Sequence, residues 1–217
     1  MKITLKRLLL PVLIYVAFSA LTFAQTNASA DKEIRDAEIA RIKAYSQELD
    51  DYAKRNPKLN RVFGDVSSGT EGDKIRWREF KGRSKSDTNY ISSLMSNAFV
   101  WSKEGAAVLV SCDFQSPSGD WAHDVNYYFR EDGSLAKIHA QLNTFYGNMT
   151  VIRERLYDSK GKLLSSSQQF LDMETQKKKK PGEDGQEFID EPITAYRTVK
   201  ALPFYIWLSK TPAAKTK

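Results

Sequence analysis

The chain has 217 residues, with 33 Lys and Arg against 27 Asp and Glu, 41% hydrophobic residues and one cysteine. This length suits a single ordinary domain with a peripheral element. The lone Cys112 excludes an intramolecular disulfide and a CxxC redox pair, and two histidines leave little for a histidine-rich metal site. No Walker loop, GxGxxG, HExxH or GxSxG string occurs, so we expect no cofactor and no metal.

Residues 1–24 have the pattern of a secretory signal peptide. A basic start is followed by an apolar run over residues 8–23 and then by small residues, so cleavage is expected after Ala24, or as late as Ala30. Pro11 interrupts the apolar run, which is also short for a bilayer span. We therefore expect an exported protein, periplasmic or extracellular, with no integral membrane span after signal removal.

Removal of the signal changes the charge of the chain. The signal contains three basic residues and no acidic one, which leaves 30 against 27, a net charge of +3. Nucleic-acid binding usually requires a concentrated basic face. We therefore expect the partner to be a protein or an amphiphilic ligand and not a nucleic acid.

Residues 31–55 are predicted to form an amphipathic helix. Asp31 is a suitable N-cap, and Asn56-Pro57 ends the helix because the residue before proline avoids the helical conformation. A narrow apolar stripe of this kind typically packs on a sheet. A membrane-surface helix is the alternative, which the acidic residues of the polar face disfavour. The stripe consists of Ile34, Ala37, Ile39, Ile42, Tyr45, Leu49 and Tyr52.

The segments that follow alternate between loops and short elements. Residues 66–73 are rich in Gly and Ser and predict a loop, whereas residues 74–81 alternate as a strand does. Residues 82–89 are polar and turn-rich. Residues 90–97 fit either a short helix or the start of a strand, and the pattern alone does not separate the two.

An internal repeat occupies the middle of the chain. Gly105, Gly133 and Gly161 are each 28 residues apart, and each follows a charged residue and has an aromatic residue four positions earlier. A two-residue loop that ends in glycine predicts a type I′ hairpin. At Asp132-Gly133 this loop pairs Phe129 with Ala136; a three-residue loop with a bulge is the alternative. Around Gly105 the same arithmetic places one set of side chains on a single face, namely Phe99, Trp101, Val108, Val110, Cys112 and Phe114.

These elements predict an α+β fold in one domain over residues 31–210. The N-terminal helix packs on a long, curled antiparallel meander over residues 74–171, built from three 28-residue hairpin repeats. Residues 176–187 form a charged loop, with binding to an anionic surface as the alternative to simple solvation. Residues 188–210 are expected to contain a last strand and a turn, and residues 211–217 a disordered tail.

Candidate catalytic residues are few and weak. Cys112 and His139 lie at offsets of opposite parity from their repeat glycines, so they are predicted to point to opposite faces, and Cys112 is expected to be a buried apolar residue. His123, Asp124 and Asp120, with Asp113 nearby, could form an acid–base cluster at the end of the sheet away from the glycines. Ordinary loop acids and one histidine are the alternative interpretation.

An apolar stripe on the outer face is the second candidate site. Val100, Tyr128 and Leu156 share one repeat offset, and Trp121 and Tyr146 are aromatic residues available nearby. Such a stripe is a second packing face beneath the helix, a partner surface or the lining of a ligand groove. We name these five residues as candidate ligand-binding residues.

The segment Tyr157-Asp158-Ser159-Lys160-Gly161-Lys162-Leu163 is similar to the Tyr-Asp-x-x-Gly-x-Leu phrase of extracellular YD-type repeats, over seven residues. The layout of a signal peptide, a leading helix and a long curved sheet is similar in outline to that of periplasmic lipoprotein or lipid carriers. The expected function is a non-catalytic binding or interaction module. A periplasmic carrier of an amphiphile in an open half-barrel, and a hydrolase that uses His123 with nearby acids, are the alternatives.

Overall fold

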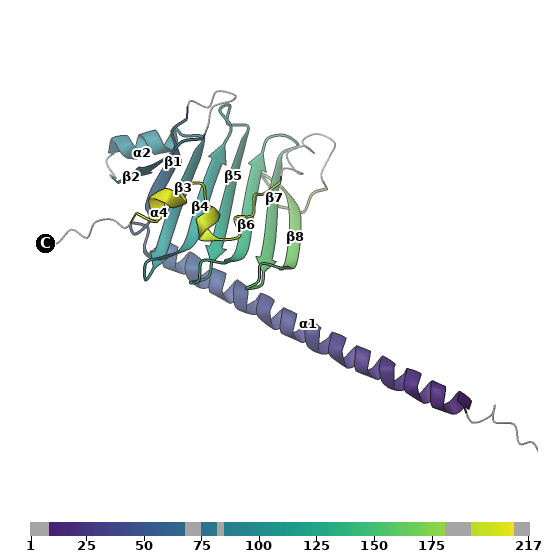
Figure 1. Cartoon of the computed structure of the whole chain (residues 1–217). Coiled ribbons are helices and arrows are strands. Elements are labelled where there is room, and N and C mark those ends of the chain that lie inside the picture. The colour runs from purple at the N-terminus through teal and green to yellow at the C-terminus, as the bar shows by residue number, and fades with distance from the viewer. Residues whose placement is uncertain (1–8, 68–74, 82–84, 181–191, 211–217) are drawn as a thin grey trace, which may run out of the picture. The chain divides into compact units, whose positions relative to one another are not determined.

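The computed structural model describes residues 9–67, 75–81, 85–180 and 192–210. Residues 61–172 contain an eight-stranded antiparallel sheet with linear strand order, on which helical segments pack (Figure 1). The predicted α+β class is confirmed. Several predicted segments lie outside the described residues: the start of the signal (1–8), most of the 66–73 loop, the second half of the charged loop (181–187), residues 188–191 and the 211–217 tail.

The described elements, in chain order, are α1 (Leu9–Arg55), β1 (Arg61–Asp65), β2 (Trp77–Phe80), α2 (Lys85–Ser92), β3 (Ser96–Lys103), β4 (Ala106–Gln115), β5 (Trp121–Phe129), β6 (Leu135–Thr144), β7 (Met149–Tyr157), β8 (Leu163–Asp172), the 3-10 turn η2 (Val199–Ala201) and α4 (Tyr205–Leu208).

The chain divides into two compact units, Met1–Arg41 and Ile42–Lys217, and the boundary falls inside α1. In the first unit α1 begins at Leu9, within the predicted signal segment, and Arg41 forms an ion pair with Glu38 one turn earlier at 2.8 Å. The second unit contains the rest of α1, the sheet and the C-terminal segment.

The last turns of α1, from Ile42 to Arg55, pack on the sheet as the apolar stripe predicted. Leu49 is fully buried, and the cluster around it draws on β4 and β5 through Val108, Leu109 and Tyr128. Tyr52 donates a hydrogen bond to the carbonyl of Ser102 at 3.1 Å. The helix ends at Arg55, directly before Asn56-Pro57, as predicted.

The sheet has the order β2-β1-β3-β4-β5-β6-β7-β8. The predicted strand at 74–81 is present as β2, but it pairs with β1 at the edge and not with the meander. Strand β1 was not predicted, because five residues that include a glycine give little alternation to detect. Both alternatives at residues 90–97 apply in part, since α2 ends at Ser92 and β3 starts at Ser96.

The three repeat glycines all turn the chain with positive φ, at 83°, 80° and 78°. The predicted two-residue loop is correct only at Glu104-Gly105, where both residues have positive φ. At Gly133 the amide of glycine donates to the carbonyl of Arg130, and the Arg130 amide donates to the Ser134 carbonyl, so this loop has three residues. The Gly161 loop closes in the same way, and in both hairpins a bulge lies directly before the last aromatic residue of the first strand, Phe129 or Tyr157.

A bulge between Trp101 and Ser102 overturns the predicted face of the first hairpin. Val100 pairs with Val110 and Ala98 with Cys112, so Val100 points the same way as Cys112. Phe99 and Trp101 therefore point to the opposite face from Val110 and Cys112. The extra residue shifts the pairing by one, which reverses the sides of all residues beyond it.

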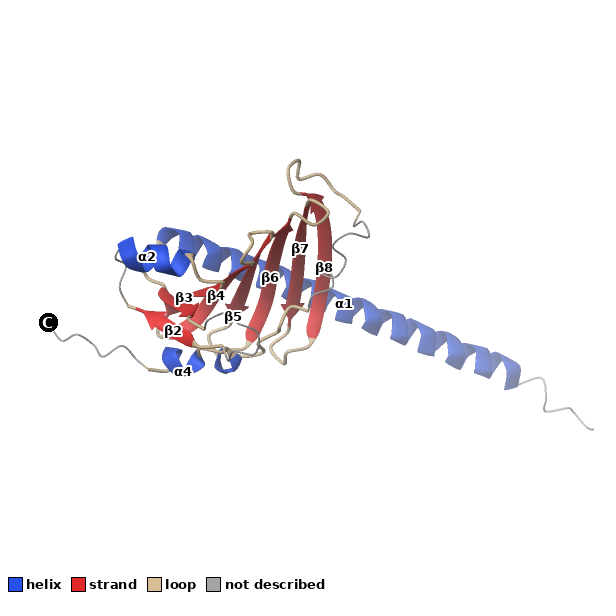
Figure 2. Ribbon diagram, turned by 90° about the horizontal axis from the view of Figure 1, so that it is seen from above, coloured by secondary structure: helices blue, strands red, loops and turns tan. Residues whose placement is uncertain are grey.

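The two faces of the sheet have different covers (Figure 2). We call the side under α1 the helix face; Ile91 of α2 and Leu94, which follows α2, also pack on it. We call the other side the C-terminal face, because residues 192–210 cross it. The predicted strand at 196–200 is absent from this segment, which forms a single bridge from Thr198 to Ser134, then η2 and α4.

Leu49 is the main apolar contact of α1 with the sheet, so Leu49→Ala is expected to lower the free energy of unfolding by about 2–5 kcal/mol through lost burial and a residual cavity. Leu59→Ala is the matched control, because Leu59 is 62% exposed, and it should change stability by less than about 0.5 kcal/mol. Urea titrations followed by circular dichroism measure both. Equal losses in the two variants would contradict this packing.

Candidate functional site

The register aligns three oxygen-bearing side chains across the helix face. Asn97 on β3 pairs with Asp113 on β4, and Asp113 pairs with Asp124 on β5. Side chains of directly paired residues project to the same side of an antiparallel sheet, about 4.5–5.5 Å apart at Cβ. We call Asn97, Asp113 and Asp124 the acceptor row.

The two carboxylates of the acceptor row lie opposite each other without a cation. No lysine or arginine among the described residues forms an ion pair with Asp113 or Asp124. Burial, and then the charge of Asp124, raise the pKa of Asp113 to about 6. Burial also raises the pKa of Asp124. Like charges in direct cross-strand contact destabilise a sheet, so this pair weakens the fold when both groups are ionised.

A cavity of about 240 Å³ lies over the acceptor row and is lined by all three of its residues. Asn97 is only 8% exposed, and its side-chain oxygen is buried without a hydrogen-bond partner among the described residues. The remaining walls are largely apolar and come from Ile91, Leu94, Phe99 and Ala122. The Asn97 oxygen lies beside Gly64 of β1, so the polar wall of the cavity comes mainly from the two carboxylates, and the rest of the wall is apolar.

Gln115 holds one wall of the cavity in place. Its side-chain amide donates to the carbonyls of Leu94 at 2.9 Å and Ser92 at 3.3 Å, which ties the end of α2 to β4. These bonds satisfy the Gln115 amide NH₂ internally, so the amide is not available to neutralise the carboxylates.

A second polar cluster lies under α1 and has a structural role. Lys137 is buried, and its ammonium contacts Glu154 at 2.7 Å and donates to the Ser46 hydroxyl at 3.3 Å. The same ammonium lies 5.4 Å from the ring of Tyr128. Hydrogen bonding from His139, together with Lys137, lowers the pKa of Glu154 to about 2. This cluster joins β5, β6 and β7 to the helix.

The predicted acid–base cluster is divided by the sheet. His123 pairs with Phe114 and therefore points to the C-terminal face, whereas Asp113 and Asp124 point to the helix face. Burial, and then the charge of Arg153, lower the pKa of His123 to about 4. Asp120 lies in the loop before β5, where it accepts a hydrogen bond from Ser118. The structure therefore does not bring His123 and Asp124 together.

The predicted Cys112–His139 separation is confirmed. Cys112 pairs with Val125, which pairs with Ala140, so His139 lies on the opposite face from Cys112. Cys112 is buried, and burial raises the pKa of its thiol. A thiol held protonated in an apolar cluster is a poor nucleophile.

The predicted apolar stripe does not form as one surface. Val100 is buried on the C-terminal face, whereas Tyr128 and Leu156 are buried on the helix face, each paired with Lys137. Trp121 packs beside Leu142 and Met149 in a small apolar cluster of the C-terminal face. Placing Val100 in the stripe was wrong, because the bulge at Trp101 reverses its side. For Tyr128, packing beneath the helix is the interpretation that fits, since it contacts Leu49.

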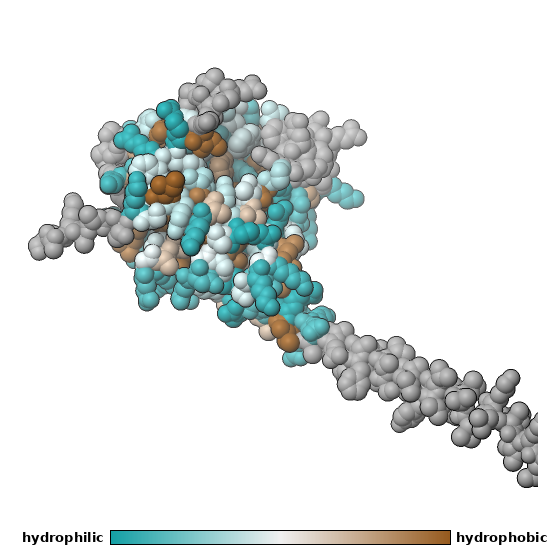
Figure 3. Space-filling model, in the orientation of Figure 1, coloured by the Kyte–Doolittle hydropathy of each residue, from teal (hydrophilic) through white to brown (hydrophobic). Residues whose placement is uncertain are grey.

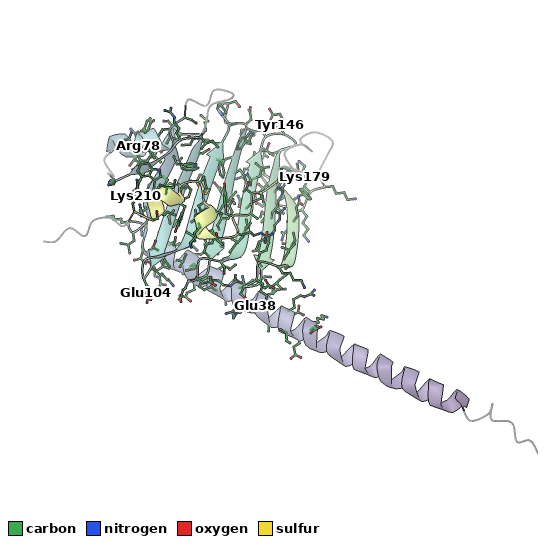
Figure 4. The ribbon with its side chains drawn as sticks, viewed as in Figure 1. Glu38, Arg78, Glu104, Tyr146, Lys179 and Lys210 are labelled. Carbon is green, nitrogen blue, oxygen red and sulfur yellow. The ribbon has the colours of Figure 1, made fainter. Side chains whose placement is uncertain are left out.

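Tyr146 lies far from the helix face cluster. It is 44% exposed in the loop between β6 and β7, and Figure 4 shows it at the opposite end of the strands from Glu104 in the first glycine loop. Tyr146 and the cavity-lining residues Ala122 and Gln115 belong to this same glycine-distal half of the sheet.

Comparisons with models of protein families, with curated proteins and with solved structures gave no match to this chain. No helix among the described residues combines the length and the apolar character that crossing a bilayer requires. Within the same residues, no three His, Cys, Asp or Glu side chains come close enough together to hold a metal ion.

The sequence interpretation named Asp113 and Asp124 but not Asn97. It grouped both acids with His123 at one end of the sheet, instead of with each other across two strands. The spacing of the two acids around their loop could have revealed this pair. In the β4–β5 hairpin, Asp113 and Asp124 pair directly if the loop 116–120 closes symmetrically. Asn97 could not be added, because the bulge in β3–β4 alters the count.

Asp113→Asn is expected to stabilise the protein at neutral pH. The folded pKa of Asp113 is about 6, above the usual value of about 3.9, so the folded state binds more protons than the unfolded state between these values. Stability therefore falls as pH rises from about 4 to 6, and the penalty persists above about pH 6. The variant removes this penalty, about 1–2 kcal/mol after solvent screening, and the gain should vanish below about pH 4.

Urea titrations near pH 7.5 and pH 4 measure this difference. Glu174→Gln is the matched control, because Glu174 is exposed and should give the same stability as the unmodified protein at both pH values. A loss of stability in Asp113→Asn at neutral pH would contradict an uncompensated carboxylate pair.

Lys137→Met is expected to lower the free energy of unfolding by about 2–4 kcal/mol, because it leaves the carboxylate of Glu154 without its buried partner. Lys103 forms a shorter contact, 2.6 Å to Glu48, but at a more exposed position. Lys103→Met should therefore lose less than about 1 kcal/mol. Urea titration compares the free energies of unfolding of the two variants. A larger decrease for Lys103→Met than for Lys137→Met would contradict the structural role of the Lys137 cluster beneath α1.

Proposed function

We propose that this protein is an exported, non-catalytic binding module whose ligand surface is the helix face of the sheet. Export rests on the signal-peptide pattern of residues 1–24. The absence of catalysis rests on the separation of the candidate groups: Cys112 and His139 occupy opposite faces, and so do His123 and Asp124. The following contacts support the choice of face.

The C-terminal face is occupied by the protein's own chain, and this is the observation on which the proposal depends. Phe204 is fully buried and stacks on Phe63, with ring centroids 4.8 Å apart, and its ring also lies 4.9 Å from that of Trp77. Ile193 and Leu202 are buried in the same cluster. These side chains fill the centre of the C-terminal face, where a carrier would hold an amphiphile.

The C-terminal segment is also fixed by polar contacts. The Leu135 amide donates to the Arg197 carbonyl at 3.0 Å, and the Val199 amide donates to the Gly133 carbonyl at 3.0 Å. Arg61 donates to the carbonyl of Trp207 at 2.7 Å while its guanidinium also contacts Glu79. Because these hydrogen bonds are spread along residues 192–210, we interpret the segment as a permanent cover and not as a lid that opens for a ligand.

The surface of the covered side agrees with this view. Figure 3 shows a mainly polar exterior with a few small hydrophobic patches, one of them over α4, and Ile206 of α4 is exposed. A patch of this size is normal for a protein surface and does not require an apolar ligand. The C-terminal face keeps cavities of about 450 Å³ beside Val199 and about 220 Å³ beside His123. The helix-face cavity differs from them in containing two paired carboxylates that form no ion pair with a described lysine or arginine.

An amphiphile-binding assay separates the binding module from the carrier. The unmodified protein is expected to give no fluorescence enhancement with N-phenyl-1-naphthylamine, because Phe204 and its neighbours fill the centre of the C-terminal face. Mass spectrometry of an organic extract should find no co-purified amphiphile. Phe204→Ala should bind the dye, since it removes a fully buried ring and leaves a cavity.

Ile206→Ala is the control, because this exposed residue of the same helix should leave dye binding unchanged. Circular dichroism confirms that each variant is folded, and Phe204→Leu provides a milder cavity if Phe204→Ala unfolds. Saturable binding of the dye by the unmodified protein, or a stoichiometric amphiphile in its extract, would overturn the proposal in favour of the carrier.

A further inference from the structure

The two edges of the sheet differ in their protection against pairing with another strand. Figure 2 shows β2 and β8 at the two ends of the sheet. Strand β2 has four residues and includes Arg78 and Glu79, and short, charged edges resist pairing with other chains. Strand β8 has ten residues, and residues 163–171 include no charged residue, proline or glycine. Of the two edges, β8 is therefore the one open to pairing.

The protein's own chain covers only the far end of the β8 edge. The Lys179 amide donates to the Phe170 carbonyl at 2.9 Å, so the backbone groups of Phe170 point away from β7. Every second residue of a strand shares this direction, and the bulge of β7–β8 lies beyond this stretch, next to Tyr157. The N–H and C=O groups of Ser166 and Gln168 therefore also point outward, where no hydrogen bond from a described residue reaches them.

The side chains of this edge suit an identical strand. The segment 163–171 is symmetric about Ser167, with two apolar residues, five uncharged polar residues and two apolar residues, and residues 166–169 are exposed. When a strand pairs with its own copy in the antiparallel direction, a charged residue near the centre meets a like charge. The β8 edge has no such charge. It thus has the self-complementary surface that a twofold dimer requires.

We propose that two copies of this chain associate through β8, with the strands antiparallel about a twofold axis at Ser167. Ser166 of one copy exchanges backbone hydrogen bonds with Gln168 of the other, and the axis repeats this exchange. The assembly closes at two copies, because β8 is then paired and the β2 edge is short and charged. This inference goes beyond the proposed binding function and does not depend on it.

The size of the interface predicts a weak dimer. Lys179 occupies the edge beside Phe170, so the pairing of the two copies centres on residues 165–169. A strand pair of this length buries less than the roughly 1,200–2,000 Å² of a stable protein interface. We therefore expect a dissociation constant between about 10 µM and 1 mM. The twofold axis is perpendicular to the joined sheet, so both helix faces lie on the same side of the dimer.

Sedimentation equilibrium of the purified protein, from about 10 µM to 1 mM, tests the association. The weight-average mass is expected to rise with concentration toward twice the mass of one chain and to stop there. A single-chain mass at all concentrations would overturn the dimer and leave an extended peptide of another protein as the occupant of the edge. Masses that continue to rise past two copies would overturn the twofold pairing.

Ser167→Lys tests the contact at the axis. The side chain of Ser167 is exposed, so the variant should remain folded, as circular dichroism can verify. It places two ammonium groups opposite each other in the dimer, so the dissociation constant should rise at least about tenfold. Asn89→Lys adds the same charge at an exposed position of α2 and should dimerise as the unmodified protein does. An unchanged dissociation constant in folded Ser167→Lys would refute pairing through β8.

Disulfide formation between copies tests the register. Ser167→Cys places two thiols across the axis, where Cα atoms of a pair without hydrogen bonds lie about 4.5 Å apart, within disulfide range. Gln169→Cys is the matched control, because residue 169 faces residue 165 of the other copy and the two new thiols lie about 13 Å apart. The native Cys112 is buried and does not compete. After mild oxidation, Ser167→Cys should give a covalent dimer on non-reducing gels, and equal yields from both variants would contradict the axis at Ser167.

Discussion

The strict alternation of side chains across the antiparallel sheet is the constraint on which the whole structure depends. Each directly paired row runs across the strands on one side only, so a residue's partner also determines its face. The bulge beside Trp101 shows how sensitive this is, because a single additional residue moves Val100 to the C-terminal face. Packing on both faces then follows from the register and not from the composition of any one strand.

Both faces of the sheet are apolar in part, and the last turns of α1 and the C-terminal segment cover them. The end of α1 covers the row nearest the glycine loops on one face, and residues 192–210 cover the other. Neither cover reaches the row of Asn97, Asp113 and Asp124, which lies between α1 and α2 on the strands. In this row the repulsion between the carboxylates of Asp113 and Asp124 destabilises the fold, and destabilising charge pairs of this kind are common in functional sites. Lys137 differs from these carboxylates, because its ammonium pairs with Glu154 and donates a hydrogen bond to Ser46. We therefore assign Lys137 a structural role.

Much of the fold could be predicted because the relevant signals are local. The helix end at Arg55 follows from Asn56-Pro57, and the three turns follow from glycines that take positive φ. The prediction that Cys112 and His139 lie on opposite faces is correct although the Gly133 loop differs from the predicted one. The additional loop residue and the bulge before Phe129 shift the pairing in opposite directions, so Asn126 still pairs with His139. The candidate site was predicted only in part. Asp113 and Asp124 were named, but they were grouped with His123, and Asn97 was not named.

The sequence by itself determined the α+β class, the glycine corners and the separation of the titratable groups that might have formed a catalytic dyad, because each depends on backbone preferences within a few residues. Only the tertiary structure decided that β1 and β2 extend the sheet, that Phe204 fills its C-terminal face, and that Asn97 lies in line with two carboxylates. These contacts join residues that are distant along the chain, and which of them forms depends on the packing energy of the whole sheet and on the position of its bulges, which no local pattern encodes.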